Sequence, residues 1–210
     1  MTVITICKEK EKYHIVGDGR MTSGHHIMSD QMVKVGSGKG YIFGICGSAS
    51  GLLTMKLLLS QSTDPAELLT MIHQDKYKHL KSLVNHVFVA CQYHGVYEMI
   101  IDSFHDKTDV AIIPFEDDAL PMVMGSGTPQ VKALLAQHED VTVEHIKKAY
   151  HAAYKVNCTI GGKISSVELE HKPKLRKELT FKQPKKSSPP KKKEDDFNEK
   201  KNKTKKKGRK

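Results

Sequence analysis

The sequence lacks a long apolar run. Its densest apolar stretch, around Leu52 to Leu59, is interrupted by Thr54 and Lys56, and a membrane-spanning helix needs about 18 apolar residues. The opening residues, MTVITICKEKEK, have no basic segment followed by a long apolar one, which is the pattern of a secretory signal. We therefore expect no membrane partner and a mature chain that starts at residue 1 or 2.

Cysteine is also scarce and unclustered. Cys7, Cys46, Cys91 and Cys158 are dispersed along the chain without a CxxC pair. Disulfide frameworks and zinc sites need clustered or regularly spaced cysteines. The pattern predicts reduced thiols, a cytoplasmic location and no metal site.

The positive charge is concentrated at one end of the chain. The 210 residues carry a formal net charge of +10, but residues 172–210 hold 18 of the 34 Lys and Arg and only 5 of the 24 Asp and Glu. Residues 1–171 are therefore slightly acidic, at about −3, and the remainder carries about +13. A basic nucleic-acid-binding surface on residues 1–171 is not indicated.

Residues 172–210 form a Lys-rich segment with Pro, Ser and Asn and almost no apolar residues. Such a composition cannot bury enough surface to offset the entropy of ordering the chain. We expect a domain at 1–171 followed by a disordered basic tail at 172–210. Two interpretations of the tail remain open: a solubilising extension, or a tether that contacts nucleic acid or an acidic partner.

The order of expected elements indicates the fold class. Segments rich in β-branched and aromatic residues predict strands at 2–7, 13–18, 40–46, 86–92, 96–102, 109–115, 121–124 and 164–169. Apolar spacing and capping residues predict helices after Gly47, at Asp64-Pro65, from about Thr128 and from Thr142. Because the helices come in pairs rather than singly between strands, a parallel βαβ fold is disfavoured. We expect an α+β fold, a four-layer αββα sandwich.

The second residue of the chain, Thr2, combines two useful groups. Methionine aminopeptidases remove Met ahead of small residues, which would leave a threonine with a free α-amine beside its hydroxyl. An α-amine with a pKa of about 7.7–8.0 can act as the base that activates this hydroxyl. Threonine is common at position 2, so further motifs are needed to support a catalytic interpretation.

Such motifs follow in order: GDGRMTSG (17–24), QMVKV (31–35), ICGSASG (45–51), MGSGTP (124–129) and NCTIGG (157–162). With Thr2 as the first residue, the series resembles the proteasome β-subunit family of N-terminal-nucleophile hydrolases, most closely its bacterial HslV-type branch. The resemblance extends from residue 2 to about residue 170. It implies a threonine endopeptidase in stacked homo-oligomeric rings, acting on polypeptides that a ring ATPase unfolds.

The resemblance also implies the catalytic residues. Thr2 would be the nucleophile, and the Lys34 ammonium would favour deprotonation of its hydroxyl and depress the pKa of its amine. Asp18 would hold Lys34, Ser126 would bond near the terminal amine, and the amide of Gly47 would stabilise the oxyanion. Taken without the other motifs, Asp18 is better explained as a turn residue and Lys34 as a solvated strand lysine.

The substrate pocket implied by the same correspondence is largely apolar. Its residues would be Met21, Thr22, Met32, Ile45 and Ala49, which suggests cleavage after bulky apolar side chains. Ordinary core packing is the alternative for the methionines.

One element departs from the family pattern. Proteasome β subunits commonly carry Asp and Ser in a DxxSGG-like element, where this chain has Asn157 and Ile160. Asn157 and Gly161 remain as supporting residues, but Asn157 brings no charge and Ile160 no hydroxyl. No cofactor is required, although the backbone carbonyls of the 154–160 loop are candidate ligands for a monovalent cation by the resemblance.

Two other functions remain open: a catalytically silent proteasome-fold structural or binding protein with a polyanion-binding tail, and an amide hydrolase that acts on a small molecule. A phosphate-binding loop is not indicated by GSGKG (36–40), which lacks the P-loop spacing. We interpret that segment as a turn between strands.

Overall fold

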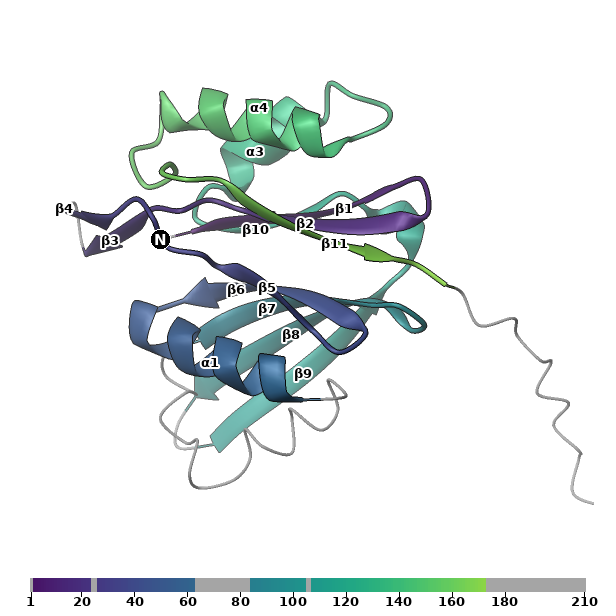
Figure 1. The fold of residues 1–210 in the computed structure, drawn as a ribbon. Coiled ribbons are helices and arrows are strands. Elements are labelled where there is room, and N and C mark those ends of the chain that lie inside the picture. The colour runs from purple at the N-terminus through teal and green to yellow at the C-terminus, as the bar shows by residue number, and fades with distance from the viewer. Residues whose placement is uncertain (1, 24–25, 63–83, 105–106, 173–210) are drawn as a thin grey trace, which may run out of the picture. The chain divides into compact units, whose positions relative to one another are not determined.

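A computed structural model describes residues 2–23, 26–62, 84–104 and 107–172 (Figure 1). The strands are β1 (Val3–Glu9), β2 (Lys12–Gly17), β3 (Met21–Ser23), β4 (His26–Ser29), β5 (Val35–Gly38), β6 (Tyr41–Gly47), β7 (Val84–Cys91), β8 (Gly95–Phe104), β9 (Lys107–Phe115), β10 (Met122–Gly125) and β11 (Ser165–Glu170). The helices are α1 (Ala49–Gln61), the 3₁₀ turn η2 (Asp117–Ala119), α3 (Thr128–Leu135) and α4 (Val143–Tyr154).

Two antiparallel sheets form the centre of the fold. One has the strand order β10-β1-β2-β11 and the other β5-β6-β7-β8-β9. Helices α3 and α4 cover the outer face of the first sheet, and α1 covers the outer face of the second (Figure 1). The predicted four-layer αββα sandwich is therefore confirmed.

The helices begin at capping residues that the sequence supplies. The Ser48 side chain accepts a hydrogen bond from the Gly51 amide at the start of α1. Thr142 and His145 form a reciprocal capping box at the start of α4. Each cap satisfies backbone N–H groups that the first helical turn leaves without partners.

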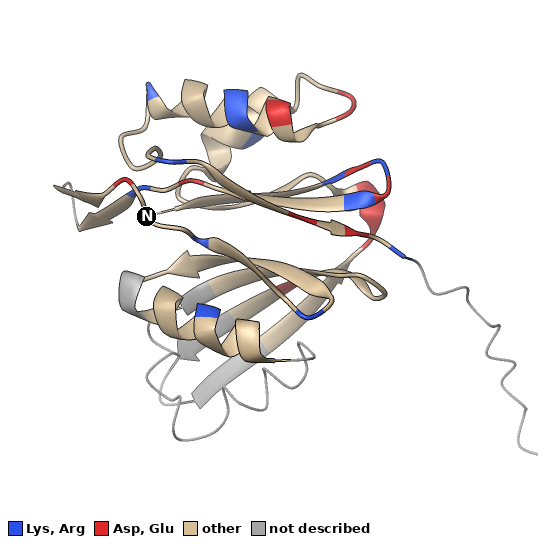
Figure 2. Ribbon diagram, in the orientation of Figure 1, with Lys and Arg blue, Asp and Glu red and all other residues tan. Residues whose placement is uncertain are grey.

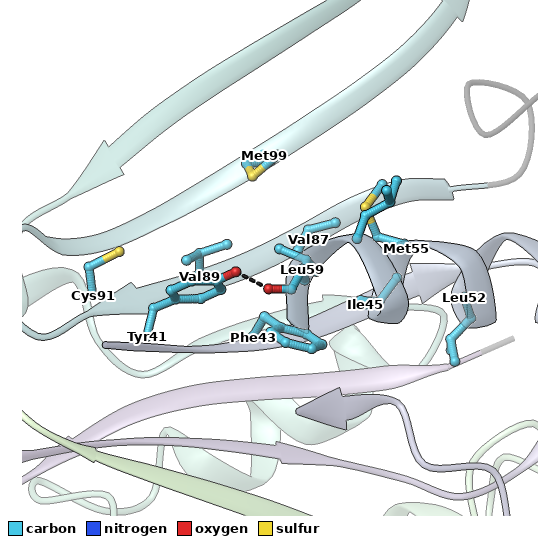
Figure 3. Close-up of a cluster of buried hydrophobic side chains, with 11 residues drawn as sticks. Tyr41, Phe43, Ile45, Leu52, Met55, Leu59, Val87, Val89, Cys91 and Met99 are labelled. Carbon is cyan, nitrogen blue, oxygen red and sulfur yellow. Dashed lines mark hydrogen bonds between the residues drawn. The ribbon is translucent and has the colours of Figure 1, made fainter. Parts of the chain in front are cut away.

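Three apolar clusters fill the three gaps between the layers. The period-2 alternation of β6 turns Tyr41, Phe43 and Ile45 towards α1 (Figure 3). It turns Ile42 and Cys46 towards the facing sheet. Alternate residues of one strand thus serve two different cores.

Strand β1 divides its side chains in the same way. Val3 and Cys7 pack beneath α3 and α4, whereas Ile4 and Ile6 face the gap between the sheets. Tyr150 of α4 ties the helix to this sheet, since its hydroxyl donates at 2.9 Å to the carbonyl of Val16 and lies 3.0 Å from Thr5 Oγ1. These contacts hold β1 and β2 against α4.

The observed elements differ from the sequence predictions in two places. The segment interpreted as a turn at 36–40 is largely strand, because Val35–Gly38 pairs with β6 and only Lys39 and Gly40 form the turn. The short hairpin of β3 and β4 was not predicted. Three-residue and four-residue strands carry too few alternating positions to give a periodic signal.

Some predictions concern residues outside the described part of the chain. The helix expected at Asp64-Pro65 lies in the undescribed segment 63–83, and nearly all of the tail lies in 173–210. Both stay predictions.

Within the described ranges, no helix is long and apolar enough to cross a membrane. Figure 2 shows charges of both signs side by side at the β1–β2 turn, where Lys8, Glu9, Lys10, Glu11 and Lys12 follow one another.

Candidate active site

Asp18 lies directly after β2 and binds the start of β1. Its Oδ1 accepts a hydrogen bond of 2.9 Å from the backbone amide of Val3, and its own amide donates to the Val3 carbonyl at 3.2 Å. Its Oδ2 accepts weaker bonds from the amides of Arg20 and Gly161, both at 3.3 Å. With 1% of its surface exposed, Asp18 is a buried acceptor that orients the peptide group joining Thr2 to Val3.

Lys34 is the cation that neutralises this carboxylate. Its Nζ donates at 2.8 Å to Asp18 Oδ1 and at 2.6 Å to the carbonyl of Arg20, and the residue is 2% exposed. Burial lowers the pKa of Lys34 from its ordinary value of 10.5, and the ion pair with Asp18 opposes this effect. A solvated strand lysine is excluded, since Lys34 is buried and precedes β5.

One carboxylate oxygen therefore binds two groups that are far apart in the sequence. Asp18 Oδ1 is hydrogen-bonded both to the Val3 amide and to the Lys34 ammonium. The ammonium is held next to the peptide group that begins at Thr2.

Thr2 and Lys34 line one cavity of about 320 Å³. The residues around it are Thr2, Arg20, Met21, Thr22, Ser23, Met28, Met32, Lys34, Gly47, Ser48 and Leu52. A nucleophile candidate, a cation, the candidate oxyanion donor Gly47 and three methionine side chains therefore share one space. Met28, from β4, is a lining residue that the sequence analysis missed.

Two of the predicted pocket residues differ from the others. Ile45 is fully buried against α1 and is not among the residues that line the cavity. Position 45 of β6 faces α1, where Ile45 packs in one cluster with Leu52, and position 46 faces the other sheet. The side chain of Ala49, the first residue of α1, lies outside the described residues.

The side chain of Cys46, the next residue of β6, lies near Gly125 and the carbonyl of Thr2. Its sulfur would lie 3.3 Å from a Cβ placed on Gly125, and that Cβ would overlap the carbonyl of Thr2. Burial raises the pKa of the Cys46 thiol to about 12. The thiol therefore stays protonated near neutral pH and does not compete as a nucleophile.

Ser126, which follows β10, also contacts Thr2. Its hydroxyl donates to the Thr2 carbonyl at 3.4 Å and lies 3.3 Å from Thr159 Oγ1. The close approach requires glycine at position 125, whose φ of +102° is strained for other residues and whose Cα faces the Thr2 carbonyl.

The 157–161 loop supplies a set of polar contacts around Ser126. Asn157 Oδ1 accepts from the Thr159 amide at 3.0 Å and from the Thr159 hydroxyl at 2.6 Å. Ile160 is fully buried in the core beneath α3 and α4. Thr159, which the sequence analysis did not select, provides the hydroxyl of this loop.

Gly161 connects the same loop to Asp18. Its amide donates to Asp18 Oδ2, and its carbonyl accepts from the Gly19 amide at 2.9 Å. Its φ of +146°, with Arg20 close to where a Cβ would stand, admits only glycine without rearrangement.

Arg20 is a second residue that the sequence analysis missed. Its guanidinium bonds both carboxylate oxygens of Asp30, at 2.7 and 3.0 Å, and the carbonyl of Cys158 at 3.0 Å. It also stacks over the Tyr154 ring, with 4.6 Å between the guanidinium carbon and the ring centroid. Arg20 thus connects the loop that holds Asp18 to the end of α4.

The Arg20 contact has an electrostatic effect on Asp30. The hydrogen bonds from the guanidinium lower the pKa of Asp30 below its ordinary value. Because Arg20 and Asp30 carry opposite charges, the Asp30 carboxylate compensates the positive charge of the Arg20 guanidinium beside the cavity.

The described ranges contain no group of three or more His, Cys, Asp or Glu residues placed to hold a metal ion. A larger hollow of about 840 Å³ lies beside the β1–β2 turn, where charged side chains such as Glu9, Lys12 and Glu168 line it. None of the residues predicted for the site lines that hollow.

Sequence comparison and structure comparison give different results. No protein-family model and no curated protein sequence matches the chain. Among solved structures, eukaryotic HslV from Trypanosoma brucei is similar over 81% of this chain and 100% of its own, with 20% sequence identity and a TM-score of 0.58.

The protein BPH from Thiobacillus denitrificans is similar to the same extent. Its free structure and its complex with epoxomicin each cover 82% of this chain and 100% of their own, with 17% identity and a TM-score of 0.59. At such identities the likeness shows the fold. The chain therefore has the proteasome β-subunit and HslV-type fold.

Proposed function

We propose that this protein is a threonine-type endopeptidase in which Thr2, freed of Met1, attacks the peptide carbonyl. The observation that carries the proposal is the single oxygen, Asp18 Oδ1, that binds both the Val3 amide and the Lys34 ammonium. A buried cation held next to Thr2 is what this chemistry needs.

The α-amine of Thr2 is the general base of the proposed reaction. The Lys34 ammonium disfavours a second positive charge nearby, so the pKa of the amine falls and more of it is neutral near pH 7. The hydroxyl gives its proton to this amine as it attacks. The peptide C–N bond then breaks, the departing amine takes that proton, and the ester left between Thr2 Oγ1 and the substrate acyl group is hydrolysed by water. The Gly47 amide, at the end of β6, donates to the oxyanion.

The cavity suggests the substrate preference. Met21, Met28 and Met32 line it with Leu52, and unbranched thioether side chains adapt to apolar groups of different shape. We expect cleavage after bulky apolar residues in unfolded polypeptides.

The proposal includes an assembly of copies of this chain into stacked rings in the cytoplasm, supplied by a ring ATPase. Exposed apolar side chains on α1 support this assembly: Leu53 and Leu57 are 62% and 55% exposed. Such exposure on adjacent turns of a helix is typical of a contact surface.

Intact mass spectrometry before and after treatment with a peptide epoxyketone tests the proposal. Expected are the loss of Met1 and one adduct per chain. The adduct should be absent in Thr2→Ala, partly retained in Thr2→Ser, and unaffected in Thr54→Ala, a threonine of α1 outside the cavity.

A chain that keeps Met1 and forms no adduct would overturn the proposal. That result would instead favour a catalytically silent structural protein of the same fold. An adduct that forms with a small amide substrate analogue but not with peptides would favour an amide hydrolase.

A further inference from the structure

A row of polar side chains runs from the 157–161 loop to Thr2, separate from the Asp18–Lys34 pair. Asn157 Oδ1 is 2.6 Å from Thr159 Oγ1, which is 3.3 Å from Ser126 Oγ, which is 3.4 Å from the Thr2 carbonyl oxygen. The first two contacts join side chains, and the last joins the Ser126 side chain to the backbone of Thr2.

The direction of the hydrogens in this row follows from elementary valence. The backbone amide of Thr159 donates at 3.0 Å to Oδ1 of Asn157, so this atom is the amide oxygen and can only accept. The hydroxyl of Thr159 must then be the donor in the bond of 2.6 Å to the same oxygen. A hydroxyl has one hydrogen, so Thr159 can meet Ser126 only as an acceptor.

This direction determines what Ser126 can do. Its single hydrogen has two acceptors within reach, Thr159 Oγ1 at 3.3 Å and the Thr2 carbonyl at 3.4 Å, and is used by one of them or shared between both. Only lone pairs remain on Ser126 for any further partner. An amine of Thr2 can therefore meet Ser126 only by donating an N–H, which leaves the amine's lone pair available to receive the proton of the Thr2 hydroxyl.

We propose that Thr159 is a positioning residue, which fixes the hydrogen of Ser126 so that the α-amine of Thr2 is oriented as a base. The proposal rests on the proposed function. It also accounts for the missing hydroxyl at position 160: Ile160 is fully buried in the core, and the neighbouring Thr159 provides a hydroxyl instead.

Thr159 does not line the cavity, so its role predicts a specific kinetic effect. Loss of its hydroxyl should lower kcat and leave KM nearly unchanged, because substrate binding is intact and only the base is misoriented. A purely structural role would lower the melting temperature and would not separate kcat from KM.

The test compares the full-length protein with Thr159→Val and Thr159→Ser. Valine has the shape of threonine without its hydroxyl. We expect Thr159→Val to lower kcat for an apolar peptide, and the rate of epoxyketone adduct formation, by roughly 10- to 100-fold, the range for a misplaced catalytic group. Thr159→Ser should restore most of the rate, and Cys158→Ala, an exposed neighbouring side chain, is the matched control.

A second variant keeps the test decisive in case Thr159→Val does not fold. Asn157→Leu removes the acceptor that orients the Thr159 hydroxyl and should also lower kcat at constant KM. If Thr159→Val does not fold, this variant decides the question by the same criterion.

The outcomes separate this inference from the proposed function. A wild-type chain without a Thr2-dependent adduct overturns both. An active wild type with an equally fast Thr159→Val, a Thr159→Ser as slow as the valine variant, or an effect on KM alone overturns the role of Thr159 and leaves the peptidase proposal standing.

Discussion

Lys34 is the residue on which the proposed chemistry most depends. It brings a positive charge into the interior, where the carboxylate of Asp18 and the carbonyl of Arg20 are its acceptors. Removing one partner of a buried ion pair leaves the other charge uncompensated, which costs about 3–5 kcal/mol.

Lys34→Met should therefore lose both activity and stability. We expect adduct formation to fall by about 10²- to 10⁴-fold. The double variant Asp18→Asn/Lys34→Met should recover much of the stability and none of the activity, as measured by urea denaturation and intact mass. Lys39→Met, at an exposed turn, is the control; a fully active Lys34→Met would contradict the assigned role.

The depressed pKa of Lys34 also predicts a pH dependence. A lysine whose pKa lies below its ordinary 10.5 loses its proton at a lower pH than a free lysine does. The rate of adduct formation should therefore decline on the alkaline side with a midpoint below pH 10.5. In Lys34→Arg the decline should shift beyond pH 11 in whatever activity remains, because arginine stays charged. A decline that is identical in both proteins would show that another group titrates.

At the scale of the elements, the close packing of the two sheets depends on Gly44 in β6. A Cβ at this position would lie 2.6 Å from Ile4 Cγ2 and 2.8 Å from Ile15 Cγ2, two buried side chains of the facing sheet. Neither atom is at the end of a flexible chain, so the sheets would have to separate.

Gly44→Ala should accordingly destabilise the protein by about 1–3 kcal/mol, the usual cost of overpacking a core. Urea denaturation measures the change, and Ser37→Ala, on an exposed position of β5, should be nearly neutral. An unchanged denaturation midpoint in Gly44→Ala would mean that the two sheets are less tightly packed than the structure indicates.

At the scale of the whole molecule, the proposed ring assembly should depend on the exposed face of α1. Leu57→Asp places a charge among the apolar side chains of that face and should dissociate the assembly into folded monomers, which light scattering coupled to gel filtration would detect. Val156→Asp makes the same change at a residue beyond α4 that is 78% exposed and should leave the assembly intact. An assembly that survives Leu57→Asp would place the contact surface elsewhere.

The basic tail is expected to act independently of the proposed peptidase chemistry. Deleting residues 173–210 removes 17 of the 34 Lys and Arg and leaves a slightly acidic chain, at about −2, so it should abolish retention on a heparin column. Adduct formation at Thr2 should change by less than about twofold, because the residues of the site all precede position 162. Retention that persists after the deletion would assign polyanion binding to residues 1–172.

The sequence by itself determined the order and type of most of the described elements, but not of β3, β4 and β5, and it selected most residues of the candidate site. Strand segments carry their period-2 pattern and helices their caps within a few residues, so the predicted strand ends differ from the observed ones by at most two residues. Asp18, Lys34, Gly47 and Ser126 could be selected because each lies in a short motif, and Thr2 because it follows the initiator Met.

Only the tertiary structure decided how these residues meet. The bonds of Asp18 to Val3 and to Lys34 span 15 and 16 residues, and the contact of Ser126 with Thr159 spans 33. Hydrogen bonds act over about 3 Å, so no local pattern reveals which distant groups share one oxygen. The contacts of Arg20 and Thr159, the position of Met28 in the cavity and the burial of Ile45 follow only from the tertiary structure.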